Sequence, residues 1–175
     1  AKLLNPMALS NLGLFYLEGK IAKKDLAKSK EYLEKAVIFN IPSAYNNLGM
    51  LYYEYGNYQE AKKCYDLAAD FKIPKAFFNI GNLYMQGKGF EKNYEKAIDY
   101  YEKAAELNDI EALYYLGTNY ANGVIIEKNS RKALEYLERS ALYGNSDAYC
   151  YLGYIYLMGE IVKKDPKKAL RYYEN

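Results

Sequence analysis

The feature that most constrains this chain is a residue pattern that returns along almost its whole length. In its clearest copy, small, apolar and aromatic residues occur at Ala76, Ile80, Gly81, Tyr84 and Gly87 and, after a short loop, at Asn93, Ala97, Tyr100 and Ala104. The pattern starts five times, at Ala8, Ala44, Ala76, Ala112 and Ala148, and the starts are separated by 36, 32, 36 and 36 residues. A fixed period in the thirties is typical of stacked structural repeats.

Each copy of the pattern predicts a pair of helices. In the first half the small and apolar residues fall at i, i+4, i+5 and i+8, and in the second half at i, i+3 and i+7, so each half has one apolar helical face. Two such helices joined by a short loop bury their apolar faces against each other and against neighbouring pairs. We therefore predict an all-helical chain built from helical hairpins.

Capping residues mark the ends of the predicted helices. Proline at the first position of a helix loses no hydrogen bond, and glycine after the last position adopts a left-handed conformation without steric cost. The predicted starts of the first helices follow Asn5, Ile41, Ile73, Asp109 and Asn145, and their ends lie at Gly19, Gly56, Gly87, Gly123 and Gly159. The second helices are predicted to start after Asp25, Asn57, Asn93, Asn129 and Asp165, which are strong N-cap residues.

Five glycines inside the first helices need another explanation, because glycine in a helix interior costs up to about 1 kcal/mol relative to alanine. They are Gly13, Gly49, Gly81, Gly117 and Gly153. Their recurrence predicts close contact with the second helix of each hairpin. We expect the second helix to contribute a small residue at this contact, namely Ser29, Ala61, Ala97, Ala133 or Ala169.

Composition limits the classes of function. The chain has 175 residues, of which 51% are hydrophobic, yet no apolar run approaches the ~20 residues of a membrane span, so we expect no membrane contact. A formal charge of +2 creates no strong field for nucleic acid. The absence of histidine removes the usual general base and the commonest metal ligand. Cys64 and Cys150 occupy different repeat positions, so we interpret both as packing residues and expect no metal site and no cofactor.

The order Ala-x3-Leu-Gly-x2-Tyr-x2-Gly, followed by Asp/Asn-x3-Ala-x2-Tyr-x3-Ala, resembles the Sel1-like repeat, a relative of the tetratricopeptide repeat. The second copy departs from it, because Gly49 and Ala61 are 12 residues apart whereas Gly81 and Ala97 are 16 apart. This shorter loop is similar to a tetratricopeptide turn. The resemblance implies a right-handed superhelical α-solenoid of antiparallel helix pairs whose first helices line a concave face. It also implies a scaffold for protein–protein interactions, an adaptor and not an enzyme.

The predicted domain is a single solenoid over residues 1–175. Residues 1–5 align with the end of a repeat, since Ala1–Asn5 corresponds to Ala105–Asp109. The repeats are predicted at about 6–41, 42–73, 74–109, 110–145 and 146–175, the last of them incomplete. We therefore expect the chain to be part of a longer protein.

No catalytic motif is recognised. None of the serines begins a Ser-x-x-Lys pair, and the glycines follow the repeat period and do not form a phosphate-binding loop. Carboxylates on the second helices alternate with lysines, which is typical of solvated helix faces. A weak penicillin-binding activity is associated with cysteine-rich relatives of the family. Because their paired cysteines are missing here, we do not carry that activity over and predict no catalytic residue.

The resemblance to tetratricopeptide arrays indicates candidate binding residues. One groove-facing position lies two residues before the mid-helix glycine and holds Asn11, Asn47 and Asn79, then Tyr115 and Tyr151. Nearby candidates are Asn46, Met50, Tyr53, Phe78, Asn82, Met85, Tyr114, Asn122 and Tyr154. We predict that the asparagine amides bind the backbone of a peptide or protein partner, with Tyr53, Phe78 and Tyr114 as apolar anchors. The alternative is that the asparagines are ordinary solvated helix residues.

Two further expectations belong to this interpretation. Asn47 and Asn79 are expected to lie off the packing frame, so that alanine at either position changes folding stability little. We also expect a monomer.

RNA binding is a second hypothesis, since helical-hairpin repeats can read RNA one base per repeat. Lysines gather on the edge formed by the loops and second helices near both ends of the chain, at Lys23, Lys24, Lys28, Lys30, Lys163, Lys164, Lys167 and Lys168. Glu91 and Glu95 interrupt this basic stripe in the middle repeat. We therefore favour a solvated edge and do not expect a nucleic-acid partner.

Overall fold

The structure is a computed structural model that describes residues 5–20 and 23–175. Apart from Asn5, the predicted end of a preceding repeat at residues 1–5 lies outside this part. The described residues form ten helices and no strand, which confirms the predicted all-α class. The helices are α1 (Pro6–Glu18), α2 (Leu26–Val37), α3 (Pro42–Glu54), α4 (Tyr58–Asp70), α5 (Pro74–Gln86), α6 (Tyr94–Glu106), α7 (Ile110–Asn122), α8 (Ser130–Leu142), α9 (Ser146–Met158) and α10 (Pro166–Tyr173).

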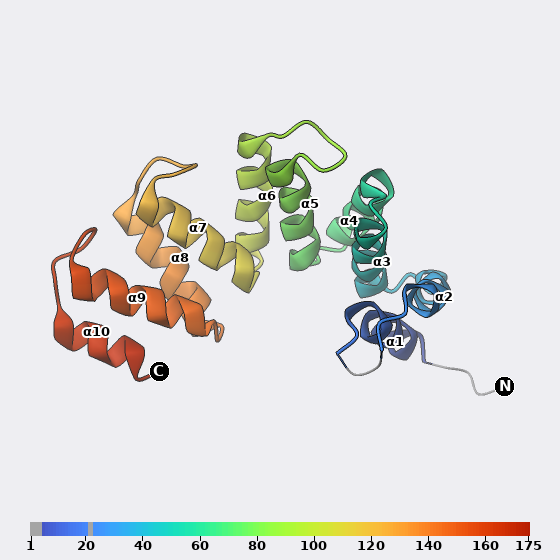
Figure 1. The fold of residues 1–175 in the computed structure, drawn as a ribbon, viewed down its shortest axis with the longest axis horizontal. Helices are drawn as coiled ribbons and strands as arrows, with labels where there is room; N and C mark the ends of the chain where they lie inside the picture. Colours follow the sequence, from blue (N-terminus) through green and yellow to red (C-terminus); the bar gives the residue numbers. More distant parts are fainter. Residues whose placement is uncertain (1–4, 21–22) are drawn as a thin grey trace. The chain divides into compact units, whose positions relative to one another are not determined.

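The helices fall into two compact units, residues 1–93 (unit 1) and 94–175 (unit 2). In unit 1, α1 and α2 form an antiparallel hairpin, α3 and α4 form a second, and α2 and α4 pack against α3 and α5 respectively (Figure 1). In unit 2, the hairpins α7–α8 and α9–α10 pack through α8 and α9, and α6 packs against α7 (Figure 1). Each unit therefore stacks helix pairs, as the repeat pattern predicts.

The helix ends follow the predicted capping residues. Proline occupies the start of α1, α3, α5 and α10, and all five predicted C-terminal glycines have positive φ, between 66° and 76°. Asp25, Asn129 and Asp165 each accept a hydrogen bond from the third backbone N–H of the helix that follows. Asn57 makes no such bond, because the short turn of the second repeat holds it at φ −85° and ψ 65°, away from the extended conformation of the other caps.

The tyrosines of the repeat pattern hold the two helices of a hairpin together. In three hairpins, the tyrosine of the first helix stacks on that of the second, with ring centroids 5.6 to 5.8 Å apart. A lysine from the first turn of the second helix lies over the first ring, 4.1 to 5.2 Å from its centroid. The three stacks are Lys28–Tyr16–Tyr32, Lys132–Tyr120–Tyr136 and Lys168–Tyr156–Tyr172. Cation–π contact and stacking add to burial here.

The mid-helix glycines lie at close helix contacts, as predicted: a Cβ at Gly13 would lie 3.3 Å from the backbone oxygen of the predicted Ser29, and one at Gly49 would lie 3.1 Å from that of Ala61. Large side chains that were not predicted come closer still. A Cβ at Gly117 would lie 2.6 Å from the Leu137 side chain, and one at Gly13 would lie 2.5 Å from that of Leu33. The nearest side chain is thus large and lies one turn beyond the predicted small residue, Ser29 or Ala133. The reason is that helical side chains lean towards the helix N-terminus and cover the preceding turn.

Replacing Gly117 with leucine is expected to lower the free energy of unfolding by about 1–3 kcal/mol, because the new side chain overlaps Leu137. Urea unfolding followed by circular dichroism measures the change. Ala27 is exposed on α2, so Ala27→Leu serves as the matched control and should change stability by less than about 0.5 kcal/mol. Equal unfolding midpoints for Gly117→Leu and the unaltered chain would contradict this account.

The two cysteines differ in environment. Cys64 packs in the core of unit 1 with Leu17, Leu33 and Leu51, as predicted. The prediction of a packing role for Cys150 was wrong, because this residue is exposed on α9, two positions after the buried Ala148 and therefore on another face of the helix. Burial raises the pKa of the Cys64 thiol to about 11, and the nearby Glu60 adds to the shift. Cys64 therefore stays a thiol well above neutral pH.

Iodoacetamide at about pH 8.5 is expected to modify Cys150 and to leave Cys64 unmodified in the folded chain, because only the thiolate reacts and Cys64 is both buried and protonated. Mass spectrometry of proteolytic fragments distinguishes the two sites. In urea the two cysteines should react at similar rates. Similar rates in the folded chain would show that Cys64 is not enclosed.

Candidate functional site

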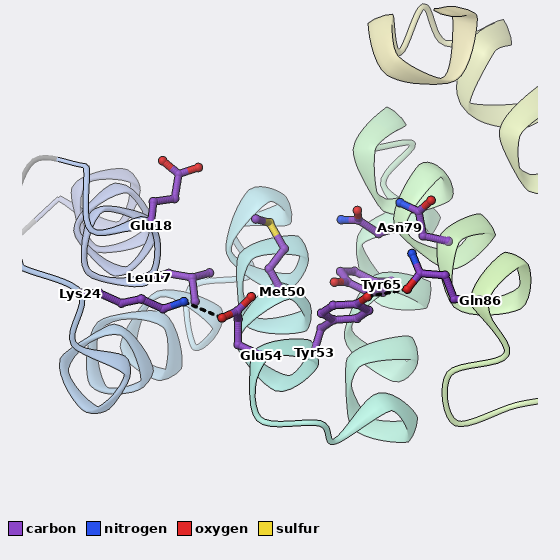
Figure 2. Close-up of a pocket in the computed structure, with 10 residues that line it drawn as sticks. Leu17, Glu18, Lys24, Met50, Tyr53, Glu54, Tyr65, Asn79 and Gln86 are labelled. Atoms are coloured by element: carbon purple, nitrogen blue, oxygen red, sulfur yellow. Dashed lines mark hydrogen bonds and ion pairs between the residues drawn. The ribbon is translucent and has the colours of Figure 1, made fainter. Parts of the chain in front are cut away.

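A pocket of about 350 Å³ opens in unit 1, and we call it the unit 1 pocket. It is lined by side chains from α1, α3, α4, α5 and the loop after α1, namely Leu17, Glu18, Lys24, Met50, Tyr53, Glu54, Tyr65, Asn79, Asn82 and Gln86 (Figure 2). Three of these helices are first helices of their repeats. The pocket therefore joins three consecutive repeats.

One side of the pocket is a row of amides on α5. Asn79, Asn82 and Gln86 lie at i, i+3 and i+7, which places them on the same face of the helix. The Asn79 Nδ2 donates a hydrogen bond to Oδ1 of the buried Asn46 over 3.0 Å. This bond holds the Asn79 side chain in place, and Asn46 does not itself line the pocket.

Tyr53 of α3 is held at the other side of the pocket. Its hydroxyl donates to the Gln86 Oε1 over 2.8 Å and accepts a hydrogen bond from the Lys88 Nζ at 2.5 Å. The edge of its ring meets Tyr58, with centroids 5.3 Å apart. The Tyr53 ring therefore presents a fixed apolar surface next to the flexible Met50 (Figure 2).

Tyr65 and one ion pair complete the lining. Burial raises the pKa of Tyr65 far above the usual tyrosine range, so its hydroxyl stays protonated. The Lys24 Nζ and Glu54 Oε2 form an ion pair at 2.5 Å, and both side chains are about half exposed (Figure 2). Exposed ion pairs contribute little to stability, so this one can rearrange at small cost.

Three of the predicted binding residues, Tyr53, Asn79 and Asn82, line the unit 1 pocket. Asn46, another predicted residue, does not line the pocket but accepts the hydrogen bond from Asn79. Met50, a nearby candidate, also lines the pocket. The structure thus brings residues of α3 and α5 together around one cavity, although their role in binding a partner stays a prediction.

The expectation that Asn47 lies off the packing frame was wrong. Asn47 is only 6% exposed, and its Nδ2 donates to the Oγ of the buried Ser10 on α1 over 3.2 Å. It lies three residues after Ala44 and four before Leu51, which are both buried, and so shares their helical face. Its contribution to binding stays a prediction, but its position in the core of unit 1 is clear.

The remaining predicted residues lie outside the unit 1 pocket. Asn11 is exposed on α1. Phe78 is partly buried, with the Lys75 Nζ 4.5 Å from its ring centroid. Tyr114 belongs to unit 2, where it meets Tyr151 edge-on and where burial, followed by the charge of Asp147, raises its pKa.

Sequence reasoning missed Leu17, Glu18, Lys24, Glu54, Tyr65 and Gln86 of the pocket lining. Gln86 had a usable signal, because it lies seven residues after Asn79 on the same helical face. The ion pair between Lys24 and Glu54 had none, since the two residues come from different repeats. Their proximity depends on how the hairpins stack.

The described residues contain no group of three or more His, Cys, Asp or Glu side chains that could hold a metal ion. Within the same part of the chain, no helix has the length and apolarity required to cross a membrane. The lining of the unit 1 pocket consists of amide, hydroxyl, aromatic and aliphatic groups, with one ion pair.

Antiparallel helix pairs at this period define a helical-repeat protein. The family model of the Sel1 repeat matches residues 6–37, 74–109, 110–145 and 146–175, and the model of the tetratricopeptide repeat matches residues 42–71. The chain belongs to the Sel1 repeat family and contains one tetratricopeptide repeat. These repeats are generally scaffolds for protein interactions, and the fold is typically non-catalytic.

Solved structures of the family are similar to this chain. A Sel1 repeat protein from Oxalobacter formigenes has 33% sequence identity and a TM-score of 0.80, over 97% of this chain and 71% of that one. A protective antigen present in uropathogenic Escherichia coli strains, displaying an SLR fold, has 30% identity and a TM-score of 0.75, over 97% of this chain and 37% of that one. Cysteine rich protein B of Helicobacter pylori has 28% identity and a TM-score of 0.56, over 74% of this chain and 96% of that one. Comparison with curated proteins gave no match.

Asn47→Ala is expected to lower the free energy of unfolding by about 1–3 kcal/mol, because it removes a buried hydrogen bond to Ser10. The exposed Asn11 occupies the equivalent position of the first repeat, so Asn11→Ala is the matched control and should leave stability nearly unchanged. Urea unfolding measures both variants. Equal stability of the two variants would contradict a packing role for Asn47.

Proposed function

We propose that this chain is a non-catalytic scaffold and that the unit 1 pocket binds an extended segment of a partner protein. The observation that carries this proposal is the row of amides on α5 beside the fixed ring of Tyr53. Family membership supports the scaffold role, and the lining of the pocket supports the kind of ligand.

The spacing of the amides suits the backbone of a peptide. With a rise of about 1.5 Å per residue along a helix, Asn82 lies about 4.5 Å and Gln86 about 10.5 Å beyond Asn79. An extended chain advances about 3.3 Å per residue, so roughly three residues span this row. An amide has two N–H donors and an oxygen with two lone pairs, so Asn79 and Gln86 keep bonding capacity for the N–H and C=O groups of a backbone beyond their bonds to Asn46 and Tyr53.

The apolar part of the pocket suits a side chain of the same segment. Leu17, Met50 and Tyr53 contribute apolar surface, and a volume of about 350 Å³ is at the small end of the range for ligand pockets. The hydrogen bonds of the Tyr53 hydroxyl hold its ring before any ligand arrives. Less side-chain entropy is then lost on binding, which favours affinity.

The ion pair at the pocket contributes to selectivity. Lys24 and Glu54 satisfy each other in the free chain and can instead pair with charged groups of the incoming segment. Exposed charges of this kind affect association rate and choice of partner more than affinity. The segment is therefore recognised by its backbone and one apolar side chain, with charges at its ends as a secondary feature.

Peptides selected by the full chain from a random phage-displayed library are expected to bind the unit 1 pocket. Asn82→Ala should weaken their binding by about 1–3 kcal/mol in titration calorimetry, because a hydrogen bond to the peptide backbone is lost. Gln86→Ala, at an exposed position of the same row, is a second variant that should also weaken binding. Asn11→Ala is the control and should not affect it.

Circular dichroism establishes that each variant is folded before titration. Selected peptides that bind the Asn82 and Gln86 variants as tightly as the unaltered chain would refute the proposed site. A loss of affinity for Asn11→Ala equal to that for Asn82→Ala would also refute it, since Asn11 does not line the pocket.

A further inference from the structure

We propose that a groove in unit 2, distinct from the unit 1 pocket, docks a basic segment of a partner protein that also carries one apolar side chain. The groove lies between α6 and the loop that joins α7 to α8, and its volume is about 560 Å³. Its lining is Tyr94, Glu95, Ile98, Asp99, Glu102, Ile125, Ile126 and Glu127. We call it the α6 groove.

The floor of the α6 groove is apolar. Ile98 comes from α6, and Ile125 and Ile126 come from the α7–α8 loop, and all three are partly buried. Val124, next to them in the loop, is 78% exposed, and Tyr94 at the start of α6 is 47% exposed. Apolar surface of this kind gains free energy when a partner covers it.

The charged side chains that line the groove are all negative. Glu95, Asp99 and Glu102 lie at i, i+4 and i+7 on one face of α6, Glu127 follows the isoleucines of the loop, and no described lysine or arginine lines the groove. The Lys103 Nζ pairs with Asp99 at 2.7 Å, and Glu102 accepts a hydrogen bond from the Tyr120 hydroxyl at 3.2 Å. Within the described residues, Glu95 and Glu127 have no ion-pair partner.

The negative charge of the α6 groove can be compared with the charges at equivalent positions of the neighbouring repeats. The same helix–loop position exists 36 residues earlier, on α4 and residues 89–91, and 36 residues later, on α8 and residues 161–163. The earlier position carries Lys62, Lys63, Asp66 and Glu91, and the later one carries Arg131, Glu135, Glu138 and Lys163. Opposite charges balance at both, whereas the α6 position carries carboxylates alone.

The packing of the hairpins does not require the α6 position to carry carboxylates alone. The later position keeps an apolar floor of Leu134, Ile161 and Val162, which pack against the core of unit 2, although its charges are balanced. The hairpin stack is thus compatible with balanced charges at this place. The carboxylates of the α6 groove instead complement a basic ligand, and the isoleucine floor complements an apolar side chain in it.

The test uses the full chain and a synthetic peptide pool in which every member has lysine or arginine on both sides of one leucine, isoleucine or phenylalanine. Fluorescence anisotropy at low ionic strength measures the affinity of the retained peptides. Glu95→Arg with Glu127→Lys, which installs the charges of the next repeat, should weaken binding by at least about tenfold. Raising the salt concentration should also weaken it, since exposed charges are screened.

The matched control is Glu160→Arg with Glu174→Lys, which makes the same change in net charge at exposed positions of unit 2 outside the α6 groove. It should retain nearly full affinity, and a pool with serine in place of the apolar residue should bind at least about tenfold more weakly. The proposal is overturned if no basic–apolar peptide is retained, if an acidic pool is retained equally well, or if the groove and control variants bind alike. Because none of these changes touches unit 1, the result is independent of the function proposed for the unit 1 pocket.

Discussion

The hairpins depend on the close approach of two helices at a glycine inside the first helix. At Gly117 there is no room for a Cβ beside Leu137, and Gly13 repeats the arrangement with Leu33. This contact brings the two apolar faces of a hairpin together, so that the tyrosine stacks and the capped loops form around it. The helical cost of glycine, up to about 1 kcal/mol, is offset by the burial that the contact permits.

Side chains outside this contact are free to differ between repeats, and, apart from Tyr65, both proposed sites are built from such side chains. The amides of α5 line the unit 1 pocket without taking part in a glycine contact, and the carboxylates of the α6 groove occupy positions that carry balanced charges one repeat earlier and later. A periodic framework of this kind fixes the backbone, while the surface residues of each repeat define what is bound.

Sequence signals were reliable where they act locally and failed where they depend on tertiary packing. Pro6, Gly19 and Asp25 set helix ends through their own backbone preferences, and all three were predicted. The spacing of Asn47 from Ala44 and Leu51 places it on the buried face of α3, but its amide is satisfied there by Ser10, 37 residues away, and no local pattern indicates that partner. Lys72 closes α4 with a left-handed φ of 58°, which lysine does not favour and which the sequence therefore does not indicate.

Tyr65 belongs to the core and to the pocket at once. Its ring covers Gly49, where a Cβ would lie 2.5 Å from Cε1, and the same residue lines the unit 1 pocket. The equivalent residue is leucine in two other hairpins, Leu33 and Leu137, and tyrosine, Tyr173, in the last. A substitution at Gly49 or Tyr65 therefore changes hairpin packing and pocket shape together. In an evolving lineage these two positions are epistatic. A substitution of Tyr65 that changes what the pocket binds is retained only if a change at Gly49 restores the packing of the hairpin.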